Sequence, residues 1–232
     1  MTRADRADDA CVVVPAFNES SVLGVVLADL GAYFGTVVVV DDGSTDATAE
    51  IARAAGAIVV RHGVNLGQGA ALQTGFDFAL RRTDVEFVVT FDADGQHAAA
   101  DAYRLLAHCR ADGLDVVLGS RGLGGCVDQP WQRRALLRLA LRFSKWSTGL
   151  ELTDTHNGLR VLRRSALSRI RLHQRGMAYA SELEGQISTL NLMWREAAVE
   201  VRYTDYSRAK GQQNLNAVNI LLDLASARIR TS

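Results

Sequence analysis

Short runs of β-branched residues alternate with helical stretches through the first 120 residues, and this alternation constrains the fold more than any other feature. The β-branched runs lie at residues 11–14, 36–40, 57–60, 86–91 and 116–118. Stretches with the helical spacing of apolar residues lie between them, at 20–34, 47–55, 69–82 and 101–111. Strands that alternate with helices form a mostly parallel sheet with helices on both faces. The pattern therefore predicts a doubly wound α/β domain.

The length of 232 residues and the hydrophobic content of 48% are sufficient for one large domain with a packed core. Gly56 and Gly113 follow two helical stretches and are expected to end them. The chain has no run of about 18 apolar residues, and its start is polar and charged, so we expect neither a membrane-spanning helix nor a secretory signal. Cys11, Cys109 and Cys126 lack the spacing of a zinc site, which suits a reducing compartment. We predict a cytoplasmic protein.

The two halves of the chain carry opposite net charges. Residues 1–130 contain 9 Lys and Arg against 18 Asp and Glu, whereas residues 131–232 contain 17 against 8. A basic half suits contact with phosphate groups or with a membrane surface, although attraction between the halves explains the same charges. Basic residues are concentrated at 130–147, where a proline-opened amphipathic helix is predicted, and a final helix is predicted at 215–229. Both helices suit either a membrane surface or ordinary core packing.

The second half is predicted to contain fewer regular elements than the first. A glycine-rich stretch at 119–129 is expected to be mobile and can serve as a lid, since glycine adds backbone freedom. Polar loops are predicted at 153–160 and 204–213, a helix at 179–190 and a strand at 197–203.

Acidic residues follow the predicted strands, at the edge where doubly wound sheets bind ligands. Asp92 and Asp94 come after the fourth strand, and alternation along an extended chain would place their side chains on the same side. Two such carboxylates can share one Mg²⁺ or Mn²⁺ ion with the oxygens of a diphosphate. The alternative is that the Asp-x-Asp-Gly sequence forms only a turn.

A second acidic cluster follows the second strand, beginning at Asp41 and Asp42 and ending at Asp46. Asp42 or Asp41 can accept hydrogen bonds from a nucleobase or from ribose hydroxyls, and Asp46 is expected to cap the next helix. Asn18 and Glu19 follow the first strand. Polar clusters at three strand ends exceed what turns require, so we predict a ligand site at this edge.

Four motifs, PAFNES, DDGSTD, NLGQGAALQTGF and DADGQH, stand in an order and at spacings that resemble the family 2 glycosyltransferases of the GT-A fold. The resemblance covers about residues 11–211 and is to the branch that transfers mannose or glucose to dolichyl or polyprenyl phosphate. It implies a single GT-A domain over 1–232. Residues 1–120 would form its nucleotide-sugar-binding half and residues 121–232 its acceptor-binding half.

The resemblance also implies roles for individual residues. Those matching the donor-binding and metal-binding positions are Pro15, Ala16, Asn18, Glu19, Asp42, Gly69, Asp92, Ala93 and Asp94, with Asp92, Asp94 and Gln96 as the metal set. Gly67, Gln68 and Gly69 match the glycine-bearing turn ahead of a helix. Arg121, in a Gly-Ser-Arg segment, matches an arginine that contacts phosphate, and Arg208 and Lys210 resemble a late phosphate clamp. Asp154 and residues 157–160 resemble the acceptor loop. Independently, cationic groups would stabilise the charge of a leaving diphosphate. The candidate catalytic residues are Asp92, Arg121 and Asp154.

Two departures from the pattern of this branch concern the acceptor. Residues 210–213 read KGQQ where the branch has Gly-Glu-Ser-Lys, and His156 and Asn157 replace a small Ser pair. A soluble hydroxyl acceptor therefore stays open beside a lipid phosphate. A hydroxyl needs a general base, for which Asp154 is the candidate unless it only braces its loop, whereas a phosphate is already nucleophilic. His97 and His156 are given structural roles only.

Two other functions fit the same alternation of strands and helices. A nicotinamide-dependent oxidoreductase needs Gly-x-Gly-x-x-Gly after the first strand, where this chain has Pro-Ala-Phe-Asn-Glu at 15–19. A non-catalytic nucleotide-sugar sensor has less need of a complete metal set. We therefore predict an inverting transferase that moves a hexose from GDP-mannose or a UDP-sugar, with Mg²⁺ or Mn²⁺, to a polyprenyl or dolichyl phosphate. No nucleic-acid partner is expected, while peripheral contact with the inner membrane surface and a homo-oligomer are left open.

Overall fold

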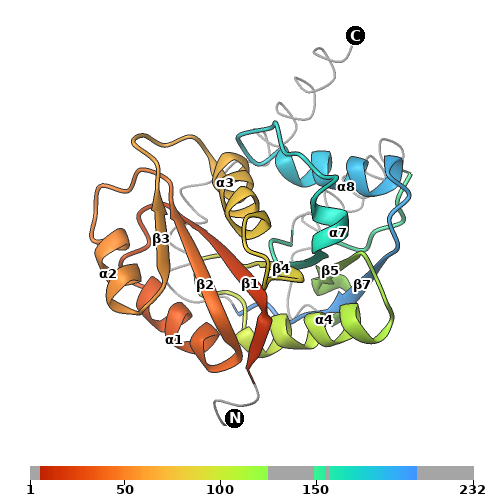
Figure 1. The fold of residues 1–232 in the computed structure, drawn as a ribbon, viewed down its shortest axis with the longest axis horizontal. Helices are drawn as coiled ribbons and strands as arrows, with labels where there is room; N and C mark the ends of the chain where they lie inside the picture. The colour runs from red at the N-terminus through yellow and green to blue at the C-terminus, as the bar shows by residue number, and fades with distance from the viewer. Residues whose placement is uncertain (1–5, 125–148, 155–156, 203–232) are drawn as a thin grey trace, which may run out of the picture.

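A sheet of seven strands runs through the part of the chain that the computed structural model describes, residues 6–124, 149–154 and 157–202 (Figure 1). In spatial order the strands are β3 (Ile58–Arg61), β2 (Phe34–Asp41), β1 (Ala7–Ala16), β4 (Phe87–Thr90), β6 (Arg160–Arg163), β5 (Val116–Ser120) and β7 (Trp194–Ala198). Strand β6 is antiparallel to both of its neighbours, and the other neighbouring pairs are parallel. The predicted mostly parallel α/β sheet is confirmed.

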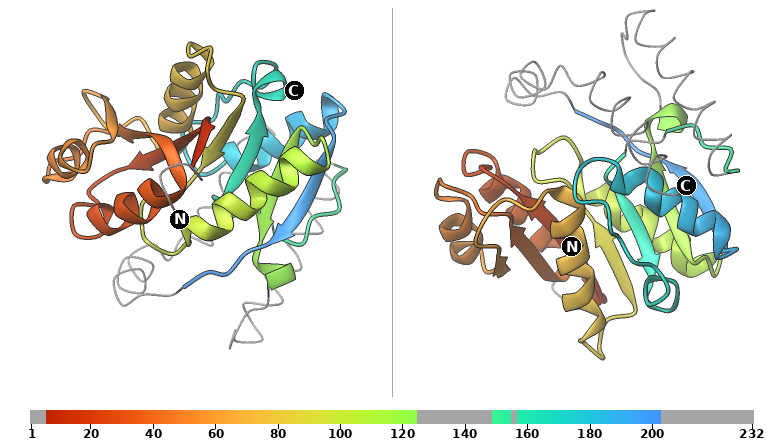
Figure 2. Two further views of the ribbon diagram at one scale, coloured as in Figure 1. Left: turned by 60° about the horizontal axis from the view of Figure 1, so that its bottom comes forward. Right: turned by 90° about the horizontal axis from the view of Figure 1, so that it is seen from above.

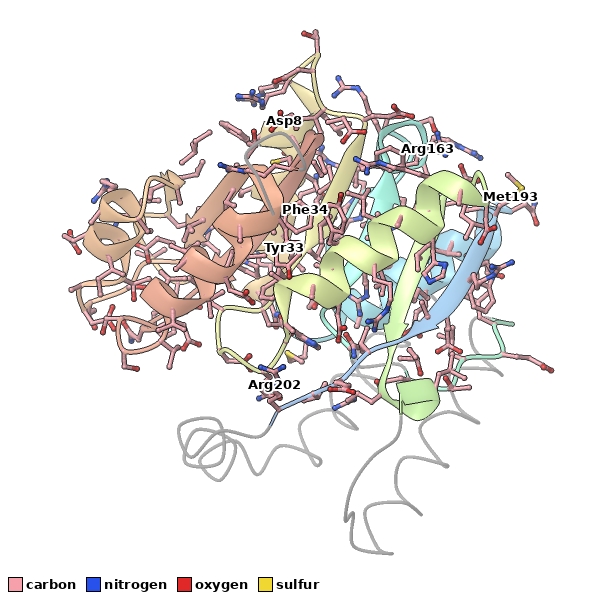
Figure 3. The ribbon with its side chains drawn as sticks, turned by 90° about the horizontal axis from the view of Figure 1, so that it is seen from below. Asp8, Tyr33, Phe34, Arg163, Met193 and Arg202 are labelled. Atoms are coloured by element: carbon pink, nitrogen blue, oxygen red, sulfur yellow. The ribbon has the colours of Figure 1, made fainter. Side chains whose placement is uncertain are left out.

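Helices cover both faces of this sheet (Figures 1 and 2). One face carries α1 (Leu23–Tyr33), α2 (Thr48–Ala54) and α4 (Ala99–Ala111), and the other carries α3 (Gln68–Leu80), α7 (Arg164–Leu167) and α8 (Tyr179–Thr189). A single helical turn, α5 (Arg121–Gly124), follows β5 directly. Figure 3 shows α1 and α4 side by side. The ring centroids of Tyr33 and Tyr103, which come from these two helices, are 5.6 Å apart.

The side chains of β1 divide the core into two layers. Val12 and Val14 belong to the apolar cluster under α1 and α4, whereas Cys11 and Val13 belong to the cluster under α3 and α8. All four are completely buried. A parallel strand covered by helices on both faces needs apolar residues at every position, which is why residues 11–14 form a continuous apolar run rather than an alternating one.

Several predicted boundaries differ from the observed ones, and one strand was missed. Strand β6 lies where the sequence analysis placed only the end of a polar loop, because its Arg-Val-Leu-Arg sequence has arginines at both ends. Strand β7 starts and ends earlier than the predicted strand at 197–203, since its register with β5 runs from Trp194 to Ala198. The predicted helix stops are confirmed, because Gly56 and Gly113 have positive φ angles of 81° and 63°.

The described part of the glycine-rich stretch, residues 119–124, forms the end of β5 and the turn α5, and three of its glycines lie close to other segments of the chain. Gly119 lies in β5, and a Cβ there would come within 2.8 Å of the Leu159 carbonyl oxygen. Gly124 lies similarly close to the backbone of Val199. These glycines permit close approach of two chain segments.

Two predicted helices, at 130–147 and 215–229, lie outside the described residues. Within the described ranges, no helix has both the length and the apolar content that crossing a bilayer requires.

Helix α3 packs closely on β1 through Gly75. A Cβ at position 75 would overlap the side chain of Val13. Because both residues are buried in the interior, neither side can move away without disturbing the packing of the layer beneath α3.

We expect Gly75→Ala to lower the free energy of unfolding by about 1–3 kcal/mol through overpacking. Gly31→Ala is the matched control, since a Cβ on this α1 glycine meets nothing within 4 Å. It should leave stability unchanged or raise it by roughly 0.5–1 kcal/mol. Urea denaturation followed by circular dichroism measures both, and equal stability of the two variants would contradict the packing argument.

Candidate active site

A cleft of about 640 Å³ opens at the carboxyl ends of β1, β2 and β4. The residues that line it come from six loops and from the starts of α3 and α8, and are Pro15, Ala16, Phe17, Glu19, Asp42, Asn65, Gly67, Gln68, Ala71, Asp92, Ala93, Asp94, Gln96, Gly158, Gly176, Met177 and Tyr179. Parallel strands bring their carboxyl ends to one edge, which is why residues far apart in the sequence meet here. Asp42, Asp92 and Asp94 lie together, as the sequence analysis required.

The loop after β1 is joined to the loop after β2 by Asn18. Its side-chain oxygen accepts a hydrogen bond from the Thr45 backbone N–H at 2.9 Å, and its own N–H donates to the Ser44 hydroxyl at 3.0 Å. Asn18 has a φ of 55°, a left-handed conformation that asparagine tolerates better than most residues. Pro15, Ala16 and Glu19 line the cleft, whereas Asn18 holds the two loops together.

The start of α2 is held by Asp46. Its carboxylate accepts hydrogen bonds from the backbone N–H groups of Thr48, the first residue of the helix, at 3.0 Å and of Ser20 at 3.2 Å. Burial by itself raises the pKa of Asp46, but the hydrogen bonds from Thr48 and Ser20 outweigh it and lower the pKa to about 2. The expected capping role is confirmed, although Asp46 stands one residue before the N-cap position.

Of the two aspartates at the end of β2, Asp42 is the one that lines the cleft. Asp41 is completely buried, where it pairs with Arg61 at 3.0 Å and accepts a hydrogen bond from the Ser44 N–H. The carboxylate of Asp42 accepts hydrogen bonds from the N–H groups of Leu66 and Gly67 at 2.8 and 2.7 Å. Asp42 therefore shapes the loop ahead of α3 while one side of it faces the cleft.

Asp92 and Asp94 lie beyond β4 in a turn that Gly95, with a φ of 73°, completes. They were expected on one side through alternation along an extended chain, but β4 ends at Thr90, so the turn and not the strand sets their positions. Both nevertheless line the cleft. Asp94 accepts a hydrogen bond from the Gln96 N–H at 3.0 Å, so the turn itself orients its carboxylate.

Neighbouring groups hold the Asp92 carboxylate in place. The Gln68 amide donates to it at 3.1 Å, and His97 Nε2 lies 3.7 Å from its other oxygen. Gly158 packs directly against it, since a Cβ there would overlap the carboxylate. Burial raises the pKa of Asp92, but His97 together with the charges of Arg160 and Arg121 lowers it overall. Asp92 is therefore ionised, and its negative charge acts on the neighbouring carboxylate of Asp94.

The pKa of Asp94 is raised to about 6, first by burial and then by the negative charge of Asp92. Two carboxylates this close favour sharing a proton or a cation. Among the described residues, no group of three or more His, Cys, Asp and Glu side chains is arranged as a complete metal site. Asp92, Asp94 and the amide oxygen of Gln96 still fit Mg²⁺ or Mn²⁺, which binds to one or two carboxylates and completes its shell with water and phosphate oxygens.

The predicted catalytic residues Arg121 and Asp154 pair with each other. The guanidinium of Arg121 donates two hydrogen bonds of 2.7 Å to the two carboxylate oxygens of Asp154, and the Arg121 backbone N–H donates a third at 3.1 Å. Neither residue is among those that line the described cleft. Arg121 thus occupies three of the about four acceptor positions of the Asp154 carboxylate, which leaves little capacity for a general base.

Gly69 has a packing role in the described structure. Its N–H donates to the Arg175 carbonyl oxygen at 2.8 Å, and a Cβ at this position would overlap Gln174. The absence of a side chain brings the loop before α8 against the start of α3. Two further predicted contacts, Arg208 and Lys210, lie outside the described residues, as does His156.

Three cleft residues were given no role from the sequence: Phe17, which stands inside the PAFNES motif, and Met177 and Tyr179, which stand just before and at the start of α8, where the sequence carries no motif. Phe17 and Met177 line the cleft with side chains that are 40% and 45% exposed. Tyr179 lines it from the start of α8, and the buried guanidinium of Arg160 lies 5.3 Å from its ring. Arg160 was assigned to an acceptor loop, but it begins β6 and lies beneath the site.

The family model described as Glycosyl transferase family 2 matches residues 11–171 of this chain. An uncharacterized protein of Methanocaldococcus jannaschii is 34% identical over 96% of this chain and 93% of its own length. The polyprenol monophosphomannose synthase of Mycolicibacterium smegmatis is 33% identical over 90% of this chain and 82% of its own length. The similarity to these two relatives extends over nearly the whole chain.

Solved structures share the fold at lower identity. The crystal structure of glucosyl-3-phosphoglycerate synthase from Mycobacterium tuberculosis, in complex with Mn²⁺, UDP and glucosyl-3-phosphoglycerate, is similar with a TM-score of 0.65 and 21% identity. The match covers 95% of this chain and 80% of that one. The predicted GT-A fold is confirmed.

We expect the affinity for Mn²⁺ to fall as the pH falls through about 6, because Asp94 must lose its proton before it can bind a cation. Below that pH the dissociation constant should rise about tenfold per pH unit. Titration calorimetry at pH 5, 6 and 7 measures it. Asp94→Asn is the control and should show weak binding with little pH dependence, whereas constant affinity of the wild-type protein over this range would rule out Asp94 as the titrating ligand.

Proposed function

Since the chain belongs to glycosyl transferase family 2, we propose that it transfers a hexose from GDP-mannose or a UDP-sugar to a polyprenyl or dolichyl phosphate, with inversion at the anomeric carbon. The observation that carries this proposal is the gathering of Asp42, Asp92 and Asp94 in one cleft at the ends of the central strands. The negative charge of Asp92 raises the pKa of Asp94, and a divalent cation that also binds the diphosphate would neutralise both carboxylates.

The donor would lie along the cleft with its nucleoside near β1 and β2. Pro15, Ala16 and Glu19 would contact the nucleoside, Asp42 would accept a hydrogen bond from the base, and the exposed ring of Phe17 offers a stacking surface. The backbone at Ala93 would lie against the ribose and the diphosphate.

The diphosphate would lie beside Asp92, Asp94 and Gln96. A divalent cation bound there would neutralise the charge that develops on the leaving nucleoside diphosphate. Asp92, which the Gln68 amide and His97 keep in position, would also lie near the anomeric carbon of the sugar. The chain itself thus orients the donor and holds the negative charge that attracts the cation.

A phosphate acceptor agrees best with the pairing of Arg121 and Asp154. A hydroxyl acceptor needs a general base, and the carboxylate oxygens of Asp154 already accept three hydrogen bonds from Arg121. An anionic phosphate oxygen is nucleophilic without a base. The relative named polyprenol monophosphomannose synthase supports the same acceptor class. Arg121, Arg208 and Lys210 are proposed to bind the phosphate, and peripheral contact with the membrane surface that holds the lipid belongs to this proposal.

Transfer of radiolabelled mannose, glucose and N-acetylglucosamine from their nucleotide carriers to a polyprenyl phosphate in detergent tests this function. We expect transfer from at least one donor in the presence of Mn²⁺ and its loss on addition of a chelator. Asp94→Asn should lower the rate roughly 10²-fold or more, because it removes the charge that holds the cation.

The matched control for this substitution is Asp84→Asn, an exposed aspartate that pairs only with the neighbouring Arg82 in the described structure. It should leave the rate within about twofold of wild type, as is usual for exposed ion pairs. Transfer that continues at the wild-type rate in chelator, or that Asp94→Asn leaves intact, is incompatible with the proposal.

A further inference from the structure

The carboxylate of Asp42 has little remaining capacity to accept hydrogen bonds. An ionised carboxylate has about four acceptor positions, two on each oxygen. Oδ1 accepts from the Leu66 N–H at 2.8 Å and contacts His62 Nδ1 at 2.7 Å, and Oδ2 accepts from the Gly67 N–H at 2.7 Å. Three positions are therefore taken, and the one that remains is on Oδ2.

The contact between His62 and Asp42 requires a proton on the histidine, because a carboxylate has none to donate. In the neutral imidazole with a proton on Nδ1, the other nitrogen is an acceptor. The hydroxyl of Thr74 lies 2.9 Å from that nitrogen, Nε2, and can donate to it. A hydroxyl that donates to Nε2 stabilises the tautomer with its proton on Nδ1, so Thr74, on α3, supports the contact that occupies Oδ1 of Asp42, and the side chains of Asp42 and His62 are both nearly buried.

Asp42 lines the cleft that is proposed to hold a nucleoside diphosphate, so the base would meet a carboxylate with a single acceptor position left. Uracil presents one ring N–H between two carbonyl groups, which matches one acceptor. Guanine presents a ring N–H beside an amino group, and this edge requires two acceptors side by side. Adenine and cytosine present a lone pair at the corresponding ring nitrogen, which a carboxylate would repel.

We propose that Asp42, with Oδ1 occupied through His62 and Thr74, makes the donor site selective for uracil, so that the donor is a UDP-sugar. This inference rests on the proposed function and narrows its donor to one base. Asp42 would touch the base, whereas His62 and Thr74 are positioning residues that act through it. Guanine bound in the same place would leave its amino group without a partner, at a cost of roughly tenfold or more in affinity.

Other cleft groups near Asp42 do not discriminate between the bases. The side chain of Asn65 is exposed, so a hydrogen bond from it to either base competes with water and does not replace a second acceptor on the buried carboxylate of Asp42. The ring of Phe17 can stack on any base. Selectivity therefore depends on how many acceptor positions of Asp42 are open.

Binding of UDP, GDP, CDP and ADP to the full chain with Mn²⁺, measured by titration calorimetry, tests this proposal. We expect UDP to bind at least about tenfold more tightly than GDP, and the other two to bind more weakly still. GDP binding as tightly as UDP would overturn the proposal. If none of the four binds, the proposed function fails with it. A transferase that uses GDP-mannose would keep the function and remove only the inference.

Substitutions of the positioning residues Thr74 and His62 show whether these residues affect the selectivity for the base or only the structure of the site. Thr74→Val keeps the shape of the side chain but removes the donor to Nε2, so the ratio of GDP to UDP dissociation constants should fall several-fold towards one. Thr74→Ser retains a hydroxyl and should restore the wild-type ratio. If Thr74→Val weakens the binding of UDP and of GDP equally, Thr74 has a structural role only, and the proposed action of Thr74 on Asp42 through His62 is wrong.

His62→Ala opens the second acceptor position of Oδ1 and should improve GDP binding relative to UDP. Thermal unfolding of this variant shows whether the loop between β3 and α3 still folds. Thr74→Val exchanges a hydroxyl for a methyl group of similar size, so this variant is expected to fold. The ratio of its GDP and UDP dissociation constants therefore tests the proposal even if His62→Ala does not fold. An unchanged ratio in a folded His62→Ala protein also contradicts the proposal.

Discussion

The repulsion between Asp92 and Asp94 is the interaction on which the site depends. The fold places both carboxylates in the turn beyond β4, where burial and the charge of Asp92 raise the pKa of Asp94 to about 6. Such an arrangement costs free energy unless the two carboxylates share a proton or a cation. Gln68, His97 and the backbone at Gly158 brace Asp92 from three sides, so the pair cannot separate to relieve the repulsion.

Close approach of backbone segments brings the later part of the chain to this pair. Gly158 lies against Asp92, and Gly67 and Gly69 lie against the loop at 174–175. A side chain at any of these glycines would push the two parts of the chain away from one another. Strand β6 contributes further, because it inserts between β4 and β5 and carries the segment at 157–160 into the centre of the sheet. The cleft therefore belongs to both halves of the chain.

Much of the fold could be predicted from residue patterns, and the failures have physical causes. The continuous apolar runs identified β1 and β2 because a strand buried on both faces needs apolar side chains throughout. Strand β6 was missed because its buried Arg160 resembles a loop residue in sequence, while in the structure it lies over the ring of Tyr179. The glycines at 119, 122 and 124 suggested freedom but permit close packing, and their partners at 159, 153 and 199 are too distant in the chain for a local pattern to reveal them.

The sequence by itself determined the α/β class, the edge of the sheet where the acidic residues gather and the family to which the chain belongs, because local periodicity and motif order record these directly. Only the tertiary structure decided which of those polar groups face the cleft. Asn18 joins two loops, Asp154 pairs with Arg121, and His62 occupies one oxygen of Asp42. Each of these contacts joins residues 20 or more positions apart, and hydrogen bonds over such separations exist only once the chain has folded.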